Sequence, residues 1–307
     1  MSKEQKYSKS FVTSLDGTTI GYRQMGSGPG LILLHGSISS SQYFMKLGET
    51  LSDEFTVYIP DRRGRGLSGP FGDKYCLQRE VEDLDAILKK TGTNYIFGAS
   101  SGGLISLQAA ITLSSIHKIV TYEPLVYADK SYMETFNATV QHFDDELSKG
   151  KNISAMVDIT KSEGHPAGAF YKLPDFIMKI IFKLILTQDE IMVKGDDVTI
   201  EDLMPTLKFD VQLVNETEGK LEKFEDVNAE VLLMRGSKSP LFLKNSLETL
   251  NKLLPHVKYM ELHGLDHDSA QNYGKPEIIA QEIKNFMNGD KKFEWEYIFD
   301  VEVKNWK

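Results

Sequence analysis

The stretch "FGASSGG", residues 97–103, decides the fold because it joins an apolar strand pattern to a helical one. It contains the pattern G-x-S-x-G, in which Gly98 and Gly102 flank Ser100. Small residues at the two outer positions allow a sharp turn from strand to helix, and such a turn exposes the central hydroxyl. The helix that follows favours negative charge at its N-terminus. The sequence therefore predicts Ser100 as a nucleophile, the alternative being a glycine-rich helix start without chemistry.

Apolar runs of strand length recur on both sides of this turn. A hairpin is expected around Asp16-Gly17, and further strands are expected at 30–35, 55–60, 94–100, 117–124, 229–236 and 256–264. Helical patterns lie between them, at 41–51, 75–90, 102–114, 241–254 and 276–287. Continuous apolar strands indicate burial on both faces and hence a parallel sheet. Their alternation with helices predicts an α/β fold with a doubly wound sheet.

Two segments depart from this alternation. Residues 125–225 hold only helix-like stretches, which predict an inserted helical layer rather than a loop of that length. We expect one apolar face within 176–186 to roof an apolar pocket, the alternative being packing within the layer alone; its residues are Phe176, Ile177, Ile180, Ile181 and Leu184. In the tail, apolar residues between 293 and 303 alternate with mainly charged ones, which predicts a half-buried strand. Such a strand would pair with a sheet edge or with a second subunit. A homo-oligomer formed through this extension is therefore one of the two expectations.

The composition of the chain limits the classes of partner and the compartment that we expect. The chain has 307 residues, 41% of them hydrophobic, and a formal net charge of −9. A surface of that sign repels phosphate backbones, so we expect no nucleic-acid partner. Cys76 is the one cysteine, so no internal disulfide can form, which fits a reducing compartment. The first residues lack a signal-peptide pattern and no apolar run is long enough to span a bilayer. We therefore expect a cytoplasmic protein without a membrane partner.

Two further motifs carry candidate chemistry. In "LLHGS", a turn after a strand would direct the backbone N–H of Ser37 toward a developing oxyanion, with the N–H of Ser101 as the second donor. His35 in the same motif is expected to brace the turn. In "HGLDHDS", His267 lies in a loop after the last core strand, where a general base is needed, and His263 is its rival.

These motifs together resemble those of the α/β-hydrolase family. "DGTTIGYRQMGSGPGLILLHG", "DRRGRGLSG", "GASSGG" and "HGLDH" occur in the order and spacing of that family, and the resemblance covers roughly residues 10–288. It implies a mostly parallel sheet of about eight strands with helices on both faces. It also implies a core at 1–124 and 226–288 and a helical cap at 125–225, followed by an extension at 289–307.

The resemblance assigns roles to residues as well. It implies Ser100 as nucleophile, Ser37 and Ser101 as oxyanion donors and His267 as base. The arginines of "DRRGRG" are expected to brace loops near the pocket rather than to hold phosphate. Epoxide hydrolases and haloalkane dehalogenases of this fold use an aspartate nucleophile, whereas a serine hydroxyl suits acyl transfer to water. The spacing of histidines and the single cysteine indicate no metal site, and no cofactor is implied.

The family's usual acid is missing. Three residues after the glycine of "MRGSKS" the chain has Ser239, which cannot supply the charge that stabilises an imidazolium. The remaining candidates are Glu123, Asp266, Asp268 and Glu261. We infer Glu123, because it ends the strand that follows the nucleophile helix and parallel strand ends open on one side of a sheet. Some dehalogenases of this fold carry their acid at the end of that same strand.

The sequence thus predicts a serine hydrolase that cleaves a carboxylic ester, or a related acyl bond, of a small substrate held under the cap. Such an enzyme would be carboxylesterase-like and would form an acyl-enzyme at Ser100, with Glu123 orienting His267. Two alternatives stay open. One is a carbon–carbon bond hydrolase built from the same residue types, and the other is a ligand-binding receptor that kept the pocket and lost turnover.

Overall fold

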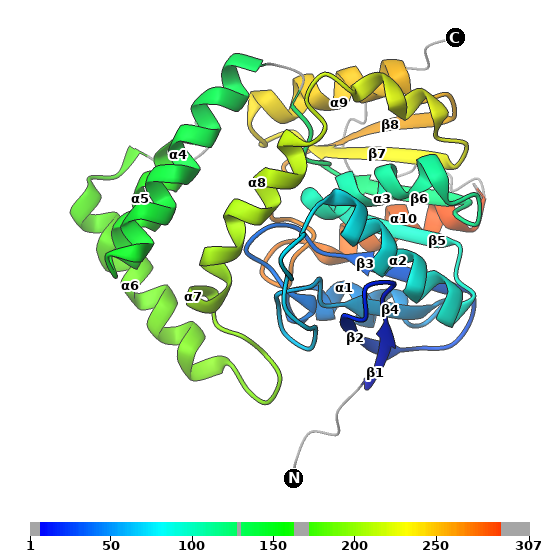
Figure 1. Ribbon diagram of the computed structural model, residues 1–307, viewed down its shortest axis with the longest axis horizontal. Coiled ribbons are helices and arrows are strands. Elements are labelled where there is room, and N and C mark those ends of the chain that lie inside the picture. The colour runs from blue at the N-terminus through cyan, green and yellow to red at the C-terminus, as the bar shows by residue number, and fades with distance from the viewer. Residues whose placement is uncertain (1–6, 128–129, 163–171, 290–307) are drawn as a thin grey trace.

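The computed structural model describes residues 7–127, 130–162 and 172–289 (Figure 1). An eight-stranded sheet forms its centre, in the order β1-β2-β4-β3-β5-β6-β7-β8. The strands are β1 Ser8–Thr13, β2 Thr19–Met25, β3 Gly30–Leu34, β4 Thr56–Pro60, β5 Tyr95–Ala99, β6 Lys118–Tyr122, β7 Glu230–Gly236 and β8 Val257–Leu262.

The sheet is mostly parallel, as the apolar runs predicted. β1 and β2 form the expected antiparallel hairpin, and β2 pairs antiparallel with β4. From β4 through β8 every neighbouring pair is parallel. β3 and β5 lie side by side at the centre, so the strand ends that carry the candidate chemistry open on one edge of the sheet. The predicted α/β-hydrolase architecture is confirmed.

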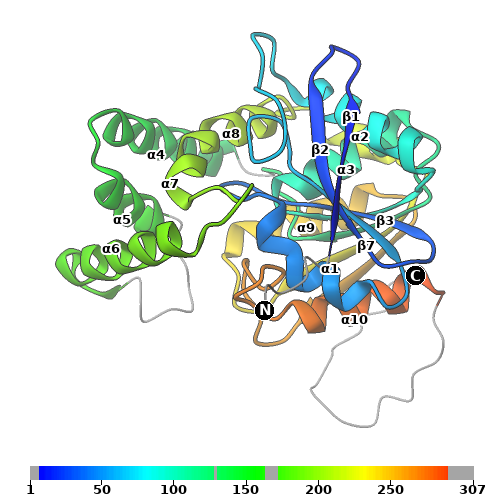
Figure 2. The same ribbon diagram turned by 90° about the horizontal axis from the view of Figure 1, so that it is seen from below.

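Helices cover both faces of this sheet (Figures 1 and 2). One face packs against α2, α3 and α9, which span Leu77–Thr91, Ser101–Thr112 and Leu241–Leu253. The opposite face packs against α1 and α10, which span Met45–Leu51 and Pro276–Met287. Along β3, Ile32 and Leu34 join the first layer, whereas Leu31 and Leu33 join the second. Burial on both faces is the reason that the strands read as continuous apolar runs.

Five α-helices lie between β6 and β7 in the described part of the chain, and we call α4–α8 the inserted helices. They are α4 Lys130–Ser148, α5 Asn152–Ser162, α6 Asp175–Met192, α7 Ile200–Leu203 and α8 Leu207–Asn215. They stand to one side of the sheet, with α8 nearest to it (Figures 1 and 2). A separate small core joins α4, α5 and α8 through Phe136, Phe143, Ile159 and Val211.

The face of α6 that was expected to roof a pocket is largely exposed. Phe176, Ile180 and Leu184 are 65%, 58% and 65% exposed. Met178 and Phe182 are buried instead, against Val157 of α5. Residues two positions apart lie on opposite sides of a helix, and α6 is apolar on both sides. Periodicity could not tell which side would pack.

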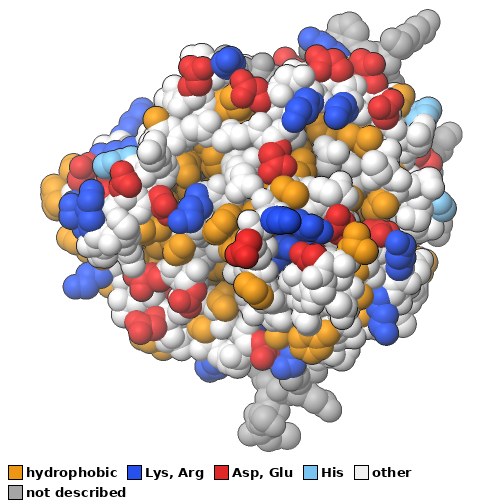
Figure 3. Space-filling model, viewed as in Figure 1, with side chains coloured by type: hydrophobic (Ala, Val, Ile, Leu, Met, Phe, Trp, Pro, Cys, Tyr) orange, Lys and Arg blue, Asp and Glu red, His pale blue; other side chains and the backbone are white. Residues whose placement is uncertain are grey.

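The surface combines charged and apolar side chains. Acidic and basic side chains are interspersed in Figure 3, and apolar ones are visible along its left edge over the inserted helices. No helix in the described part of the chain is both long and apolar enough to cross a membrane. The predicted tail strand at 293–303 lies outside the described residues.

Candidate active site

Ser100 lies at the sharp turn between β5 and α3, with φ 52° and ψ −124°. A residue with a side chain rarely adopts a positive φ, so the surrounding structure must hold this turn in place. A Cβ on Gly98 would lie 2.5 Å from the carbonyl oxygen of Gly102. A Cβ on Gly102 would lie 2.3 Å from the carbonyl oxygen of Leu34 on β3. Both glycines of the G-x-S-x-G pattern are therefore required by close backbone packing.

Backbone hydrogen bonds tie Ser100 to the end of β6. Its N–H donates to the carbonyl of Tyr122 over 3.0 Å, and its carbonyl accepts from the N–H of Leu125 over 3.0 Å. The loop after β3 also passes close by, since a Cβ on Gly36 would lie 2.8 Å from the Cβ of Ser100. Ser100 remains 8% exposed. The hydroxyl thus stands where the ends of β3, β5 and β6 meet.

Glu123 and His267 form a short hydrogen-bonded contact beside this turn. Glu123 is fully buried, and its backbone has a φ of 50° just after β6. Its Oε1 accepts the N–H of Gly236 over 2.7 Å, and its Oε2 lies 2.6 Å from Nδ1 of His267. Because an ionised carboxylate only accepts, Nδ1 carries the proton in this contact. Nε2 is then the ring nitrogen left to act as a base, on a side chain that is 29% exposed.

The Glu123 carboxylate occupies the end of β7, although it belongs to β6. The two strands are neighbours, with Tyr122 paired to Met234, so a side chain at position 123 can reach Gly236 directly. Ser239, where the acid was missing, is 4% exposed, and its hydroxyl has no hydrogen-bond partner among the described residues. A carboxylate from the adjacent strand thus contacts the histidine that an acid at 239 was expected to contact.

The other candidate acids make different contacts. Glu261 pairs with Arg235 over 2.6 Å, and Asp266 accepts the Ser269 hydroxyl over 2.8 Å. Asp268 accepts from Gln271 over 3.0 Å. The rival base His263 is exposed in the turn after β8, whereas His267 reaches Glu123.

Ser37 and Ser101, the expected oxyanion donors, lie side by side. Ser37 follows β3 and Ser101 begins α3, and their hydroxyl oxygens are 3.4 Å apart. Neither backbone N–H donates a hydrogen bond to another described residue. The residue after Ser37, Ile38, has a φ of 44°, so the loop turns sharply at this point. Two unused N–H donors at the strand ends can serve an anion.

His35 braces the loop that carries Ser37. Its Nε2 accepts the backbone N–H of Arg62 over 3.1 Å, and its Nδ1 lies 3.0 Å from the carbonyl oxygen of Gly36. Complete burial, together with the positive charges of Arg65 and Arg62, lowers the pKa of His35 well below its usual value. The ring is therefore neutral, with the proton on Nδ1.

A buried network of charges lies behind the turn that carries Ser100. The Arg62 guanidinium contacts Glu80 over 2.9 Å, Asp210 over 2.7 Å and the Ser101 hydroxyl over 2.9 Å. Asp210 also accepts from Arg65 over 2.5 Å and from the Ser101 hydroxyl over 2.8 Å. All of these side chains are almost completely buried. The arginines thus bond carboxylates of this chain, in agreement with their expected bracing role.

Arg63 makes a separate set of contacts. Its guanidinium pairs with Asp83 of α2 over 2.6 Å and with Asp16 of the first hairpin over 2.9 Å. It therefore fastens the β1–β2 turn to the helix layer rather than contributing to the site.

Asp210 and Glu80 were not predicted from the sequence. Asp210 follows Leu207 and precedes Val211 and Val214, which are all buried on α8. A single acid within an apolar helix face is a signal for a buried polar contact, because an unpaired charge there is costly. The sequence thus contained a hint of the position but not of its partners.

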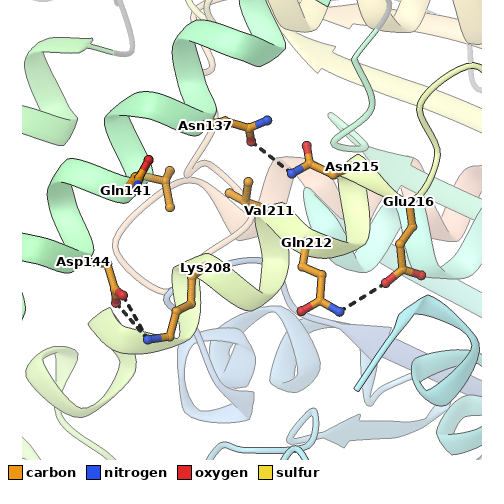
Figure 4. Close-up of a pocket in the computed structure, with 9 residues that line it drawn as sticks. Asn137, Gln141, Asp144, Lys208, Val211, Gln212, Asn215 and Glu216 are labelled. Atoms are coloured by element: carbon orange, nitrogen blue, oxygen red, sulfur yellow. Dashed lines mark hydrogen bonds and ion pairs between the residues drawn. The ribbon is translucent and has the colours of Figure 1, made fainter. Parts of the chain in front are cut away.

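A groove of about 700 Å³ lies between α4 and α8, apart from these residues (Figure 4). Its polar side chains bond one another: Lys208 contacts Asp144 over 3.0 Å, and Asn215 donates to Asn137 over 3.1 Å. None of the candidate catalytic residues lines it. Across residues 7–127, 130–162 and 172–289, no group of three or more His, Cys, Asp or Glu side chains is arranged to hold a metal ion.

Comparison with known proteins shows the family of this fold. A family model described as the alpha/beta hydrolase fold matches residues 29–269. A relative from Mesorhizobium japonicum, 2-(acetamidomethylene)succinate hydrolase, is 24% identical over 273 residues, covering 88% of this chain and 92% of the relative.

Solved structures give the same result. An alpha/beta hydrolase from Sphaerobacter thermophilus has a TM-score of 0.70 at 26% identity, covering 91% of this chain and 100% of that one. An esterase from Rhodococcus sp. has a TM-score of 0.64 at 17% identity, covering 92% and 99%, and is alike in fold alone. The family match runs from the start of β3 to the loop that holds His267, and this chain belongs to the α/β-hydrolase fold family.

Proposed function

We propose that this hydrolase-fold chain is a serine hydrolase that cleaves a carboxylic ester, or a related acyl bond, of a small substrate. The observation that carries the proposal is the 2.6 Å contact between Glu123 Oε2 and His267 Nδ1. It supplies the acid that the sequence lacks at position 239, at a site where a strained turn presents Ser100. A serine, a histidine and an acid in this chain order suit acyl transfer through a covalent intermediate.

The reaction follows from the geometry. Nε2 of His267 accepts the Ser100 proton as the hydroxyl oxygen attacks the substrate carbonyl, while the backbone N–H groups of Ser37 and Ser101 bind the oxyanion. The protonated ring then gives its proton to the leaving oxygen, and the acyl group stays on Ser100. Water, activated by the same Nε2, releases the acid. Glu123 holds the Nδ1 proton in place and stabilises the charged ring throughout.

The inserted helices complete the site in this proposal. Residues 125–225 would act as a cap over a core formed by 1–124 and 226–288. α8 is the inserted helix that reaches the nucleophile turn, through the hydrogen bond from Ser101 to Asp210. A cap of this kind limits the space above Ser100, which favours a small substrate over a polymer.

The relative from Mesorhizobium japonicum adds a second substrate class. The compound in its name carries an acetamido group, and the match covers 88% of this chain. An acyl–nitrogen bond is therefore the second candidate, and the same residues would serve it. Carbon–carbon cleavage and ligand binding without turnover are the alternatives that the experiment must separate.

A fluorophosphonate probe tests the proposal, because it reacts with an activated serine and needs no knowledge of the substrate. Wild-type protein should become labelled and should hydrolyse p-nitrophenyl acetate, whereas Ser100→Ala should do neither. Folded wild-type protein that resists the probe would argue for the binding-only alternative. Labelling without hydrolysis of esters or amides would direct the search to carbon–carbon bonds.

A further inference from the structure

We infer that Asp210, on α8 of the inserted helices, is a positioning residue that sets the oxyanion-binding geometry of Ser37 and Ser101. The inference rests on the proposed function, because it concerns the site at which Ser100 would act. Asp210 would not touch the substrate. It would act by fixing the nucleophile turn from behind, so that the N–H of Ser101 is aimed at the oxyanion.

The hydrogen bonds converge on this carboxylate. Asp210 Oδ1 accepts the Ser101 hydroxyl over 2.8 Å and Nη1 of Arg62 over 2.7 Å, and that same Nη1 donates to the Ser101 oxygen over 2.9 Å. The Ser37 hydroxyl oxygen lies 3.4 Å from that of Ser101. The side chains of both oxyanion residues thus belong to one cluster, whose centre is supplied by the inserted helices.

Arg62 provides a second connection between the loop after β3 and the β5–α3 turn. Its side chain fixes Ser101, while its backbone N–H fixes His35, two residues before Ser37. Asp210 in turn holds the Arg62 guanidinium, together with Glu80 on the other side. A substitution at Asp210 should therefore alter the positions of the loop after β3 and of the β5–α3 turn together.

The charges make this arrangement stiff. Arg62 and Arg65 carry two positive charges, which the carboxylates of Glu80 and Asp210 balance; Asp210 is completely buried. Removing one partner of a buried charged contact leaves the other uncompensated, which is strongly unfavourable. α8 is therefore held against the turn that carries Ser100. The position of this helix and the direction of the Ser101 N–H depend on each other.

The opposite side of α8 offers a matched control. Lys208 lies two residues before Asp210, which places it on the other side of the helix. It faces the α4–α8 groove, pairs with Asp144 and is 46% exposed (Figure 4). Lys208→Ala removes an ion pair of the same helix without touching the network behind Ser100.

The experiment compares Ser101→Ala, Asp210→Asn and the double variant with wild type and Lys208→Ala. Each protein is titrated with the fluorophosphonate, so that kcat and KM for p-nitrophenyl acetate are expressed per reactive serine. The rate constant of labelling is measured as well, because the phosphonyl oxygen occupies the oxyanion position. Thermal unfolding shows which variants remain folded at the assay temperature.

Ser101→Ala keeps the backbone N–H and the Asp210 ion pairs, and it removes the contacts of the hydroxyl with Asp210, Arg62 and Ser37. We expect Ser101→Ala and Asp210→Asn each to lower kcat by about tenfold to a hundredfold with KM within about twofold, since misplacing one oxyanion donor costs part of its full effect. The labelling rate constant should fall in parallel. The double variant should be no worse than the poorer single variant by more than about twofold, since both changes disrupt the same cluster of contacts behind Ser100. Lys208→Ala should match wild type.

Three results would overturn the inference alone. Wild-type kcat and labelling in folded Ser101→Ala would show that the hydroxyl does not position the turn. Independent, multiplying losses in the double variant would give Asp210 and Ser101 separate roles. If Asp210→Asn lowers only the fraction of protein that has a reactive serine, and kcat per reactive serine stays normal, Asp210 is a purely structural residue. A wild type that is neither labelled nor active would overturn the proposed function itself, and this inference with it.

Discussion

Glu123 Oε2 lies 2.6 Å from Nδ1 of His267, although the two residues are 144 positions apart in the chain. Two features of the fold create this contact. β6 and β7 are neighbours, so the residue after Tyr122 reaches the end of β7 at Gly236. The Tyr122 hydroxyl donates to the carbonyl of Asp266 over 2.5 Å, which holds the loop of His267 next to β6. One strand end thus positions both members of the pair.

Replacement of Ser100 should separate chemistry from strain. Ser100→Ala and Ser100→Gly should both lower kcat for a short-chain ester by up to about 10⁶, because each removes the proposed nucleophile. Glycine accepts the φ of 52° without strain, so Ser100→Gly should be more stable than Ser100→Ala by about 1 kcal/mol. Denaturant unfolding and ester assays measure the two effects. Equal stabilities would show that the turn stores little strain, and retained activity in either variant would place the chemistry elsewhere.

His35 should make the protein sensitive to mild acid. Its pKa is held well below the usual value by burial and by Arg65 and Arg62, whereas the unfolded chain takes up a proton below about pH 6.5. Acid therefore favours the unfolded state, and this residue should lower the free energy of unfolding by about 1 kcal/mol between about pH 6.5 and about pH 5.5. His35→Gln should lose that part of the pH dependence. An unchanged slope in the variant, measured by urea unfolding, would assign the effect to other groups.

The two sides of α6 should respond differently to substitution. Phe182 is 6% exposed and packs on α5, so Phe182→Ala should destabilise the protein by about 3–5 kcal/mol. Ile180 is 58% exposed, so Ile180→Lys should change the free energy of unfolding by less than about 0.5 kcal/mol. Denaturant unfolding of the two variants, prepared in parallel, gives the comparison. A large loss in Ile180→Lys would mean that this face is covered in solution.

Much of the fold could be read from the sequence because each signal was local. Apolar runs marked strands buried on both faces, and the glycines at 98 and 102 marked a turn that closes only without side chains. The position of Glu123 also followed from topology, since it needed only the knowledge that parallel strand ends share one edge.

The errors and omissions concern long-range packing. Which side of α6 would pack could not be predicted, because Ile180 and Phe182 are equally apolar and only contact with α5 distinguishes them. Asp210 is 109 positions from Ser101, and no spacing rule connects an acid on an inserted helix with a hydroxyl at the nucleophile turn. Its partners are set by the packing of α8 against α3, which no local pattern encodes.

The contact between Glu123 and His267 gives the sharpest test of the proposed site. Glu123→Gln keeps the shape and can still accept the N–H of Gly236, but an amide cannot stabilise a positively charged ring. Its NH₂ group would also face Nδ1 of His267 and would favour the wrong tautomer. We expect kcat to fall by about 10⁴ with KM little changed. Ser239→Ala is the control, and it should stay within about twofold of wild type because the Ser239 hydroxyl has no described partner.

A second substitution should restore part of the lost activity. Glu123→Gln combined with Ser239→Asp returns a carboxylate to the strand end that the Glu123 side chain now reaches, so kcat should rise at least about tenfold above that of Glu123→Gln alone. Ser239→Asp in the presence of Glu123 should bring no gain, since two carboxylates near one ring repel each other and one would stay protonated. If Glu123→Gln keeps kcat within about threefold of wild type, the 2.6 Å contact serves structure rather than catalysis. Asp266 and Asp268, the acids beside His267, would then be the next residues to replace, because they remain within the same loop.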